Sequence, residues 1–155
     1  MLCFRETALG KIGIEDRDGS IVAVYFENDP VSPDREVGET ALLRQAFKQL
    51  ESYLAGRLTE FSLPLEPEGT PFMKEVWRKL QDVPYGQTAS YKDIATAVGN
   101  PKAVRAVGQA NNRNPLPIFI PCHRIIGSNG RLVGYGGGLA LKEMLLELEK
   151  QHGGV

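Results

Sequence analysis

The sequence contains very little cysteine and histidine. Only Cys3, Cys122, His123 and His152 occur among its 155 residues, and the two cysteines stand 119 positions apart. So few soft ligands, with no Cys-x-x-Cys pair, exclude a disulfide framework and a protein-encased zinc site. We therefore expect no metal ion and no cofactor.

Long hydrophobic runs are also absent. No window approaches the ~20 consecutive apolar residues of a membrane-spanning helix, and the start, Met1-Leu-Cys-Phe-Arg, lacks the pattern of a signal peptide. With 42% hydrophobic and 24% charged residues, the composition excludes a disordered chain. We expect a folded cytoplasmic protein that does not contact a membrane.

Neither sign of charge dominates, because the net charge of −1 averages two opposite segments. Residues 1–70 carry 7 Lys/Arg and 13 Asp/Glu, whereas residues 71–135 carry 9 Lys/Arg and 3 Asp/Glu. A basic island of this kind favours an anionic partner, with nucleic acid first. A solvated basic face explains the charge equally well, so both interpretations stay open.

The first part of the chain predicts a small sheet followed by a helix. Apolar runs at 2–4, 11–14 and 21–26, with Asp18-Gly19 between the last two, predict strands that include a hairpin. Helical spacing of apolar residues predicts an amphipathic helix over 38–54, and 61–65 could form an edge strand. The Pro-rich stretch 64–71 coincides with the charge reversal, so we expect domains at 1–66 and 67–155.

The second part predicts mainly helices. Thr70-Pro71 begins one, with Phe72, Met73, Val76, Trp77 and Leu80 as its buried stripe. Residues 90–98 and 103–111 then read as two short helices joined by a tight turn, which is the helix-turn-helix pattern. Many helical domains contain such a pair, so this pattern alone does not establish DNA binding.

A cysteine directly followed by histidine ends an apolar, Pro-rich run, Asn114 to Arg124. A lone cysteine is commonly an inert buried residue, but thiol chemistry needs a thiolate, which a neighbouring His123 or Arg124 favours. If this segment is a strand, adjacent side chains point to opposite faces, and a water or a third group must relay the proton.

The chain ends in a glycine-rich segment and a predicted helix. A turn at 127–130 precedes Val133-Gly-Tyr-Gly-Gly-Gly138, and the helix then runs to about Gln151. Its predicted apolar stripe is Leu141, Met144, Leu145 and Leu148, with Glu143 and Glu147 on the solvated face. The glycine loop lacks the Gly-Lys-Ser/Thr ending of a nucleotide site.

Several of these motifs, in this order, resemble one family. They are Tyr91, the run Gly99-Asn-Pro-Lys-Ala-Val-Arg-Ala-Val-Gly108, Asn114-Pro, Pro121-Cys-His-Arg124, and Tyr135-Gly-Gly-Gly-Leu before Lys142-Glu. Together they are similar to the O6-alkylguanine-DNA alkyltransferases, also called methylated-DNA:protein-cysteine methyltransferases. The resemblance is close over 71–149 and holds in outline over 1–65.

The resemblance implies an α+β fold and a DNA-repair reaction. A small N-terminal sheet-and-helix domain, ribonuclease H-like, would precede a mostly helical, winged helix-turn-helix-like catalytic domain. The protein, a monomer, would bind double-stranded DNA containing alkylated guanine, flip the base through the minor groove and transfer the alkyl group irreversibly to its own cysteine. O4-alkylthymine is a second candidate substrate.

Residue roles follow from the same resemblance. In the catalytic group, Cys122 would be the acceptor, His123 a base acting through water, Glu149 and Asn114 its organisers, and Tyr91 the residue that helps to rotate the nucleotide and donates a proton to guanine. At the DNA, Arg105 would fill the gap in the base stack, Ala103, Ala106 and Gly108 would keep the recognition helix slim, and Lys102 and Arg124 would add basic contacts. The base pocket would comprise Tyr135, Gly136 and the Ile125 carbonyl.

Two departures from the family pattern are visible. Gly136 stands where some relatives have a serine that reaches the alkylated oxygen, so that side-chain hydrogen bond cannot form here. The metal ligands that some relatives carry in the N-terminal domain are missing, with Cys3 the only nearby thiol.

Three other functions stay open on the sequence alone. A non-enzymatic reader of damaged bases would lack the acceptor cysteine, which is present here. A helix-turn-helix regulator would need a dimer element, and none is evident. A cysteine hydrolase would fit Cys-His-Glu but not the basic helix pair.

Overall fold

The computed structural model describes residues 1–132 and 138–153, and it divides into two compact units, Met1–Pro67 and Glu68–Val155. Each unit is described by itself. Both α and β elements occur, as the α+β prediction requires: a small antiparallel sheet in the first unit and mainly helices in the second.

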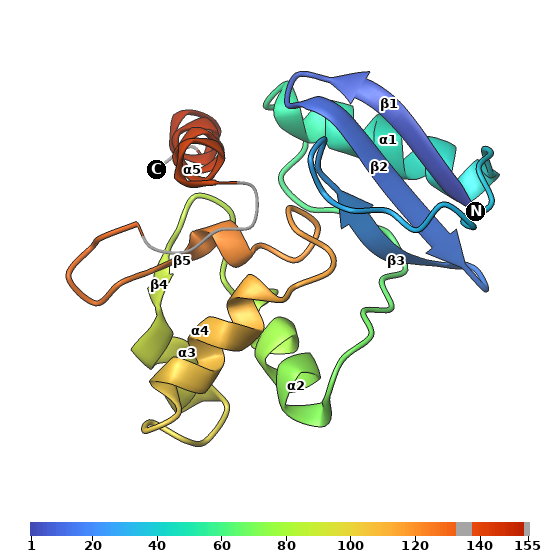
Figure 1. Ribbon diagram of the computed structural model, residues 1–155. Helices are drawn as coiled ribbons and strands as arrows, with labels where there is room; N and C mark the ends of the chain where they lie inside the picture. Colours follow the sequence, from blue (N-terminus) through green and yellow to red (C-terminus); the bar gives the residue numbers. More distant parts are fainter. Residues whose placement is uncertain (133–137, 154–155) are drawn as a thin grey trace. The chain divides into compact units, whose positions relative to one another are not determined.

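The first unit is built on a three-stranded antiparallel sheet of order β1-β2-β3 (Figure 1). Its strands are β1 (Leu2–Thr7), β2 (Gly10–Arg17) and β3 (Ser20–Tyr25). The predicted hairpin is confirmed: Arg17 pairs with Ser20, and Asp18 and Gly19 both have positive φ, 52° and 82°. Positive φ at both turn positions matches the right-handed twist of the strands.

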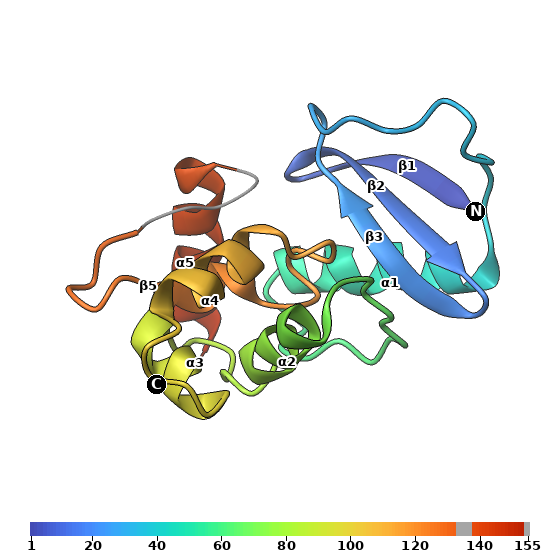
Figure 2. The same ribbon diagram turned by 60° about the horizontal axis from the view of Figure 1, so that its bottom comes forward.

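One helix, α1 (Ala41–Leu54), covers this sheet and closes its core (Figure 2). Its buried residues Leu43, Phe47 and Leu50 are at most 1% exposed. The Thr40 side chain caps it by accepting from Leu43 N at 3.0 Å. The possible edge strand at 61–65 is reduced to one bridge between Ile21 and Leu65.

The second unit contains four α-helices, one short 3-10 turn and one short parallel strand pair in its described part. The helices are α2 (Pro71–Leu80), α3 (Tyr91–Ala97), α4 (Val104–Asn112) and α5 (Leu139–His152), and the strands are β4 (Ala89–Ser90) and β5 (Ile125–Ile126). Helices α2, α3 and α4 pack on one another, and the view in Figure 2 shows them grouped.

Local signals explain where these helices begin. Thr70 caps α2 with Pro71 at its first position, and Ser90 forms a capping box with Asp93 at the start of α3. The indole of Trp77, 1% exposed, donates to the Ala110 carbonyl at 2.8 Å and so ties α2 to α4. Phe72, predicted to be buried in α2, is 37% exposed because it lies in the first turn, away from this contact.

No helix within residues 1–132 and 138–153 is both long enough and apolar enough to cross a bilayer.

Candidate active site

Cys122 lies in a single 3-10 turn, η1 (Cys122–Arg124), between the Pro-rich loop and β5. The premise that this segment is a strand is therefore wrong, because the prolines break the ladder before it. The Cys122 N–H donates to the Ile120 carbonyl at 2.7 Å, and Ile118 has a φ of 76°, which is strained for a β-branched residue. The loop thus presents Cys122 from a tightly fixed backbone.

The Cys122 side chain is buried, with 4% of the residue exposed. Burial raises the pKa of its thiol to about 11, opposed by a hydrogen bond from Asn114 and by the positive charge of Lys142. At neutral pH the group is therefore a thiol and needs a base before it can act as a nucleophile.

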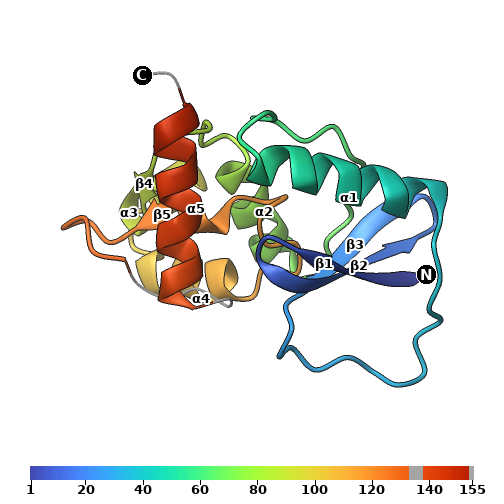
Figure 3. The ribbon, with the colours of Figure 1, turned by 90° about the horizontal axis from the view of Figure 1, so that it is seen from above.

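The residue that the sequence predicts as this base is His123, which is fully buried and bonded to Glu149 of α5. His123 Nε2 lies 2.6 Å from Glu149 Oε2. Figure 3 shows α5 standing beside β5, and α5 contacts the turn that holds Cys122. Since Glu149 is ionised, Nε2 carries the hydrogen and the other ring nitrogen, Nδ1, is the basic one.

Arg124 completes this cluster from inside the protein. Its Nε lies 2.8 Å from Glu149 Oε1 and its Nη2 lies 3.1 Å from Oε2, while Nη1 donates to the Val83 carbonyl at 2.7 Å. The sequence predicts a DNA contact for Arg124, but the residue is 7% exposed and these bonds engage three of its nitrogens. The geometry therefore groups Arg124 with His123 and Glu149.

The electrostatics of the pair follow from this arrangement. Burial alone would raise the pKa of Glu149, but hydrogen bonds from His123 and Arg124 outweigh it and lower that pKa to about 2. The pKa of His123 is lowered, mainly by burial and further by the charges of Arg124 and Lys142, although Glu149 acts in the opposite direction. At neutral pH His123 is a neutral imidazole beside a carboxylate.

The buried face of α5 differs from its predicted apolar stripe. The buried residues are Lys142, Leu145 and Glu149, whereas Met144 is 43% exposed. Charged residues occupy this face because partners across the site compensate them: Lys142 Nζ donates to the Ile125 carbonyl at 2.5 Å. That carbonyl, predicted to contact guanine, thus already accepts one hydrogen bond.

Two asparagines organise the backbone around the thiol. Asn114 donates from Nδ2 to the Ile120 carbonyl at 2.9 Å, and its Oδ1 accepts from Leu116 N at 2.9 Å. Asn111, 2% exposed, donates from Nδ2 to the Cys122 carbonyl at 3.4 Å. Asn111 is not among the predicted site residues, although a polar residue beside the buried Val107 and Ala110 of α4 is a recognisable signal.

Tyr91, the first residue of α3, lies near this group. Burial raises the pKa of its phenol, the nearby Cys122 raises it further, and a hydrogen bond with Asn111 opposes them. Asn111 therefore links the cysteine turn to the tyrosine predicted to donate a proton.

The residues predicted to contact DNA gather on α4 and the turn before it. Lys102, Arg105 and Ala106 are exposed, and Ala103 and Gly108 are half-buried. A Cβ on Gly108 would lie 3.9 Å from the Tyr91 ring, so the predicted recognition helix and the tyrosine are neighbours.

Tyr135 and Gly136 lie outside the described residues. No group of three or more His, Cys, Asp or Glu side chains in residues 1–132 and 138–153 is placed to hold a metal ion.

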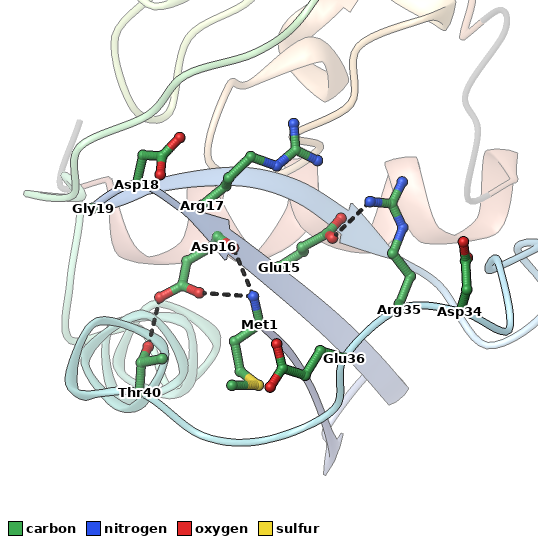
Figure 4. Close-up of a pocket in the computed structure, with 10 residues that line it drawn as sticks. All are labelled: Met1, Glu15, Asp16, Arg17, Asp18, Gly19, Asp34, Arg35, Glu36 and Thr40. Carbon is green, nitrogen blue, oxygen red and sulfur yellow. Dashed lines mark hydrogen bonds and ion pairs between the residues drawn. The ribbon is translucent and has the colours of Figure 1, made fainter.

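A charged pocket of about 530 Å³ occurs in the first unit (Figure 4). Its buried carboxylates are held by the protein itself. Asp16 accepts from Thr40 at 2.6 Å and lies 3.4 Å from the amino terminus of Met1, and Glu15 accepts from Tyr25 at 3.0 Å and pairs with Arg35 at 3.2 Å. These contacts fasten the start of β1 and the loop before α1, so we assign the pocket a structural role.

Comparisons with known proteins agree with this geometry. Residues 71–151 match the family model described as 6-O-methylguanine DNA methyltransferase, DNA binding domain, and residues 4–67 match that of its ribonuclease-like domain. The chain is 47% identical over 152 residues to the constitutive methylated-DNA–protein-cysteine methyltransferase of Bacillus subtilis, covering 94% of this chain and 92% of that one. It is 56% identical over 117 residues to the Methanosarcina acetivorans enzyme of the same name, covering 76% and 75%.

Solved structures give the same result. The Mycobacterium tuberculosis OGT structure in complex with DNA superposes with a TM-score of 0.92 at 39% identity, covering 97% of this chain and 93% of that one.

Proposed function

Because the chain belongs to the 6-O-methylguanine DNA methyltransferase family, we propose that it repairs DNA by moving the alkyl group of O6-alkylguanine to Cys122. The observation that carries the proposal is the buried Cys122 next to the His123–Glu149 pair. This thiol has no charge at neutral pH but stands beside a base that is also neutral and held in one tautomer.

The reaction combines proton transfers at Cys122 and at guanine with one displacement at the alkyl carbon. Through a water, His123 Nδ1 takes the thiol proton, and Glu149 stabilises the imidazolium that results. The thiolate sulfur then attacks the alkyl carbon, the carbon–O6 bond breaks, and guanine leaves with the bonding electrons. Tyr91 donates a proton to the departing guanine, and the proton that His123 took from the thiol then returns to the Tyr91 phenolate through solvent, which leaves both His123 and Tyr91 neutral.

The product determines the stoichiometry. A thioether at Cys122 is stable, so each molecule is expected to act once. In the proposed base pocket, Tyr135 would form one wall and Gly136 would leave extra room for larger alkyl groups.

Access to the alkylated oxygen requires that the base leave the duplex, because O6 lies on the Watson–Crick edge. We propose that α4 enters the minor groove with Ala103, Ala106 and Gly108 against the sugar edges. Arg105 would fill the gap in the stack, and Lys102 would contact phosphate. The exposure of Lys102 and Arg105 supports these assignments.

We also propose that the two domains have different functions. Residues 67–155 would bind DNA and carry the reaction, and residues 1–66 would form a separate α/β domain. We propose a cytoplasmic monomer that uses no cofactor and no metal, and O4-alkylthymine as a second substrate class.

Radiolabelled O6-methylguanine DNA tests the proposal. Label should move to the tryptic peptide that contains Cys122, with at most one methyl group per protein molecule even when DNA is in excess. The Cys122→Ser variant should bind the DNA and accept no label. Sustained turnover, or label on another residue, would contradict the proposal, and release of a hydrolysis product would point to a cysteine hydrolase.

A further inference from the structure

Glu149 accepts hydrogen bonds from more donors than a simple histidine partner needs. Besides His123 at 2.6 Å, Arg124 contacts both of its oxygens, at 2.8 and 3.1 Å, and the Gly86 N–H donates to Oε1 at 3.2 Å. The carboxylate is 1% exposed, so these bonds act with little solvent screening. One negative charge is thus divided between a titratable imidazole and a permanent cation.

We propose that Arg124 is a positioning residue, which shares the Glu149 carboxylate with His123 and so keeps Cys122 and His123 as thiol and neutral imidazole until damaged DNA binds. The inference rests on the proposed function, since a protein whose cysteine reacts only once loses its whole activity when another electrophile alkylates that cysteine first. Arg124 would therefore protect the single-use cysteine from other electrophiles.

Cys122 and His123 can share one proton in two forms. Thiol with imidazole converts to thiolate with imidazolium when His123 takes the Cys122 proton, and each tenfold gain in His123 basicity raises the ion-pair population tenfold. The guanidinium opposes that gain because it neutralises Glu149 and repels a second cation close by. Binding of damaged DNA would supply the free energy for ion-pair formation only when the alkyl group is in place.

The other charged and titratable groups around His123 do not replace Arg124. On α5, Glu149 favours the imidazolium and Lys142 opposes it. From the loop after α2, the Tyr85 ring lies 5.7 Å from the Arg124 guanidinium carbon. Helix α2 itself directs Val76, Trp77 and Leu80 inward. Tyr91 and Cys122 are uncharged at neutral pH, and Arg124 is a permanent cation in direct contact with the carboxylate that is bonded to His123.

Two measurements on the full chain test this inference without using DNA. The first is an NMR titration of the imidazole groups, in which the exposed His152 serves as the internal reference. The second is the rate at which iodoacetamide alkylates Cys122 at neutral pH, with mass spectrometry separating its peptide from that of Cys3. The variants are Arg124→Met, Arg124→Lys, Glu149→Gln and the Arg124→Met/Glu149→Gln double variant.

In Arg124→Met, the His123 midpoint should rise above the value of about 6.5 of an unperturbed imidazole, and iodoacetamide should react about tenfold faster for each pH unit gained. In Arg124→Lys, the His123 midpoint and the alkylation rate should lie between those of Arg124→Met and the parent. A lysine ammonium keeps the positive charge but cannot contact both oxygens of Glu149 as the guanidinium does. Glu149→Gln should slow the alkylation of Cys122 by iodoacetamide. The Arg124→Met/Glu149→Gln double variant should react at nearly the same slow rate.

Two results would overturn the inference. One is a folded Arg124→Met protein whose His123 midpoint is unchanged or lower. The other is an Arg124→Met protein whose His123 midpoint lies near 6.5 and whose Cys122 is alkylated faster even when Glu149→Gln is also present. That combination would mean that the substitution exposes the site to solvent and does not act through Glu149. The repair assay on the parent protein tests the proposed function separately, so the two can fail independently.

Discussion

The described part of the second unit buries Arg124, Lys142 and Glu149 around Cys122, at 7%, 0% and 1% exposure. With His123 neutral, these three side chains leave an excess of one positive charge when Lys142 is protonated. When His123 takes the proton of Cys122, the thiolate and the imidazolium form together, so this excess of one positive charge is unchanged. Within the cluster, the positive charge of Lys142 favours the thiolate sulfur by lowering the Cys122 pKa, whereas burial keeps the thiol protonated at rest.

Lys142→Met tests this balance at a single residue. Lys142 lowers the pKa of Cys122, so its removal should slow alkyl transfer from free O6-benzylguanine about tenfold at neutral pH, with recovery as pH rises. The melting temperature should change little, because methionine fills similar space without a buried charge. Lys150→Met, on the exposed side of the same helix, is the control. Equal rates in the parent and Lys142→Met would refute the electrostatic role.

Among the elements, α3 connects folding signals to the site most directly. Ser90 pairs with Ile126 of β5 as the last residue of β4, and it also caps α3, where Tyr91 follows at once. The Ser90 hydroxyl accepts from Asp93 N at 3.0 Å, and the Asp93 carboxylate accepts from Ser90 N at 2.9 Å. One residue therefore sets both the start of α3 and the place of Tyr91.

Removal of this cap should have a measurable cost. Ser90→Ala should lower the free energy of unfolding by about 1 kcal/mol, because the first turn of α3 loses a partner for one backbone N–H. Chemical denaturation gives this value, with Thr96→Ala on the exposed face of α3 as the control. A larger loss in Thr96→Ala than in Ser90→Ala would contradict the capping argument.

Helix α4 carries the prediction for base flipping. If Arg105 occupies the vacated stack, Arg105→Ala should slow repair of duplex DNA much more than reaction with free O6-benzylguanine, which needs no flipping. Arg44→Ala removes an equal charge from α1 and should affect neither substrate strongly. Equal losses on both substrates in Arg105→Ala would count against the intercalating role.

Local patterns predicted these elements well, and long-range contacts explain where prediction failed. The hairpin at Asp18-Gly19 and the caps at Thr70 and Ser90 depend on residues close in sequence, and the structure contains them. The burial of Arg124 depends on Glu149, 25 positions away, and on Val83, 41 positions away. From the sequence alone, the basic residue after Cys122-His123 is therefore predicted to lie on the surface and contact DNA, because its buried partners are distant in the sequence.

Across the whole molecule, charge is divided along the chain. The acidic residues concentrate in 1–70 and the basic ones in 71–135, so attraction to DNA should come from the second segment. Binding to duplex DNA should weaken steeply with salt, and a substitution that removes one phosphate-binding side chain should reduce the slope of log K against log salt by about 0.9. Lys102→Ala, compared with Lys48→Ala of α1, measures this by titration at several salt concentrations. A slope unchanged by Lys102→Ala would remove that residue from the interface.

Stability of the protein should be greatest near neutral pH, since the buried site favours uncharged Cys122 and His123. The pKa of His123 is lower in the folded state, so unfolding takes up a proton and stability falls as pH drops below about 6.5. The Glu149 pKa is also lowered, to about 2, and its contribution is lost as pH falls from about 4.5 toward that value. On the alkaline side, the raised pKa of Cys122 means that the unfolded thiol ionises first, so stability falls between about pH 9 and 11, by at most about 3 kcal/mol.

Urea denaturation across this pH range, with Cys122→Ala as the matched variant, separates the acidic and the alkaline losses of stability. Cys122→Ala should reduce the loss of stability at alkaline pH and keep the loss at acid pH, because His123 and Glu149 remain. Cys3→Ala, in β1 of the first unit, is the control for the removal of a thiol. An alkaline loss of the same size in the parent and in Cys122→Ala would show that the Cys122 thiol is not held protonated by its surroundings, and the need for His123 as its base would disappear with it.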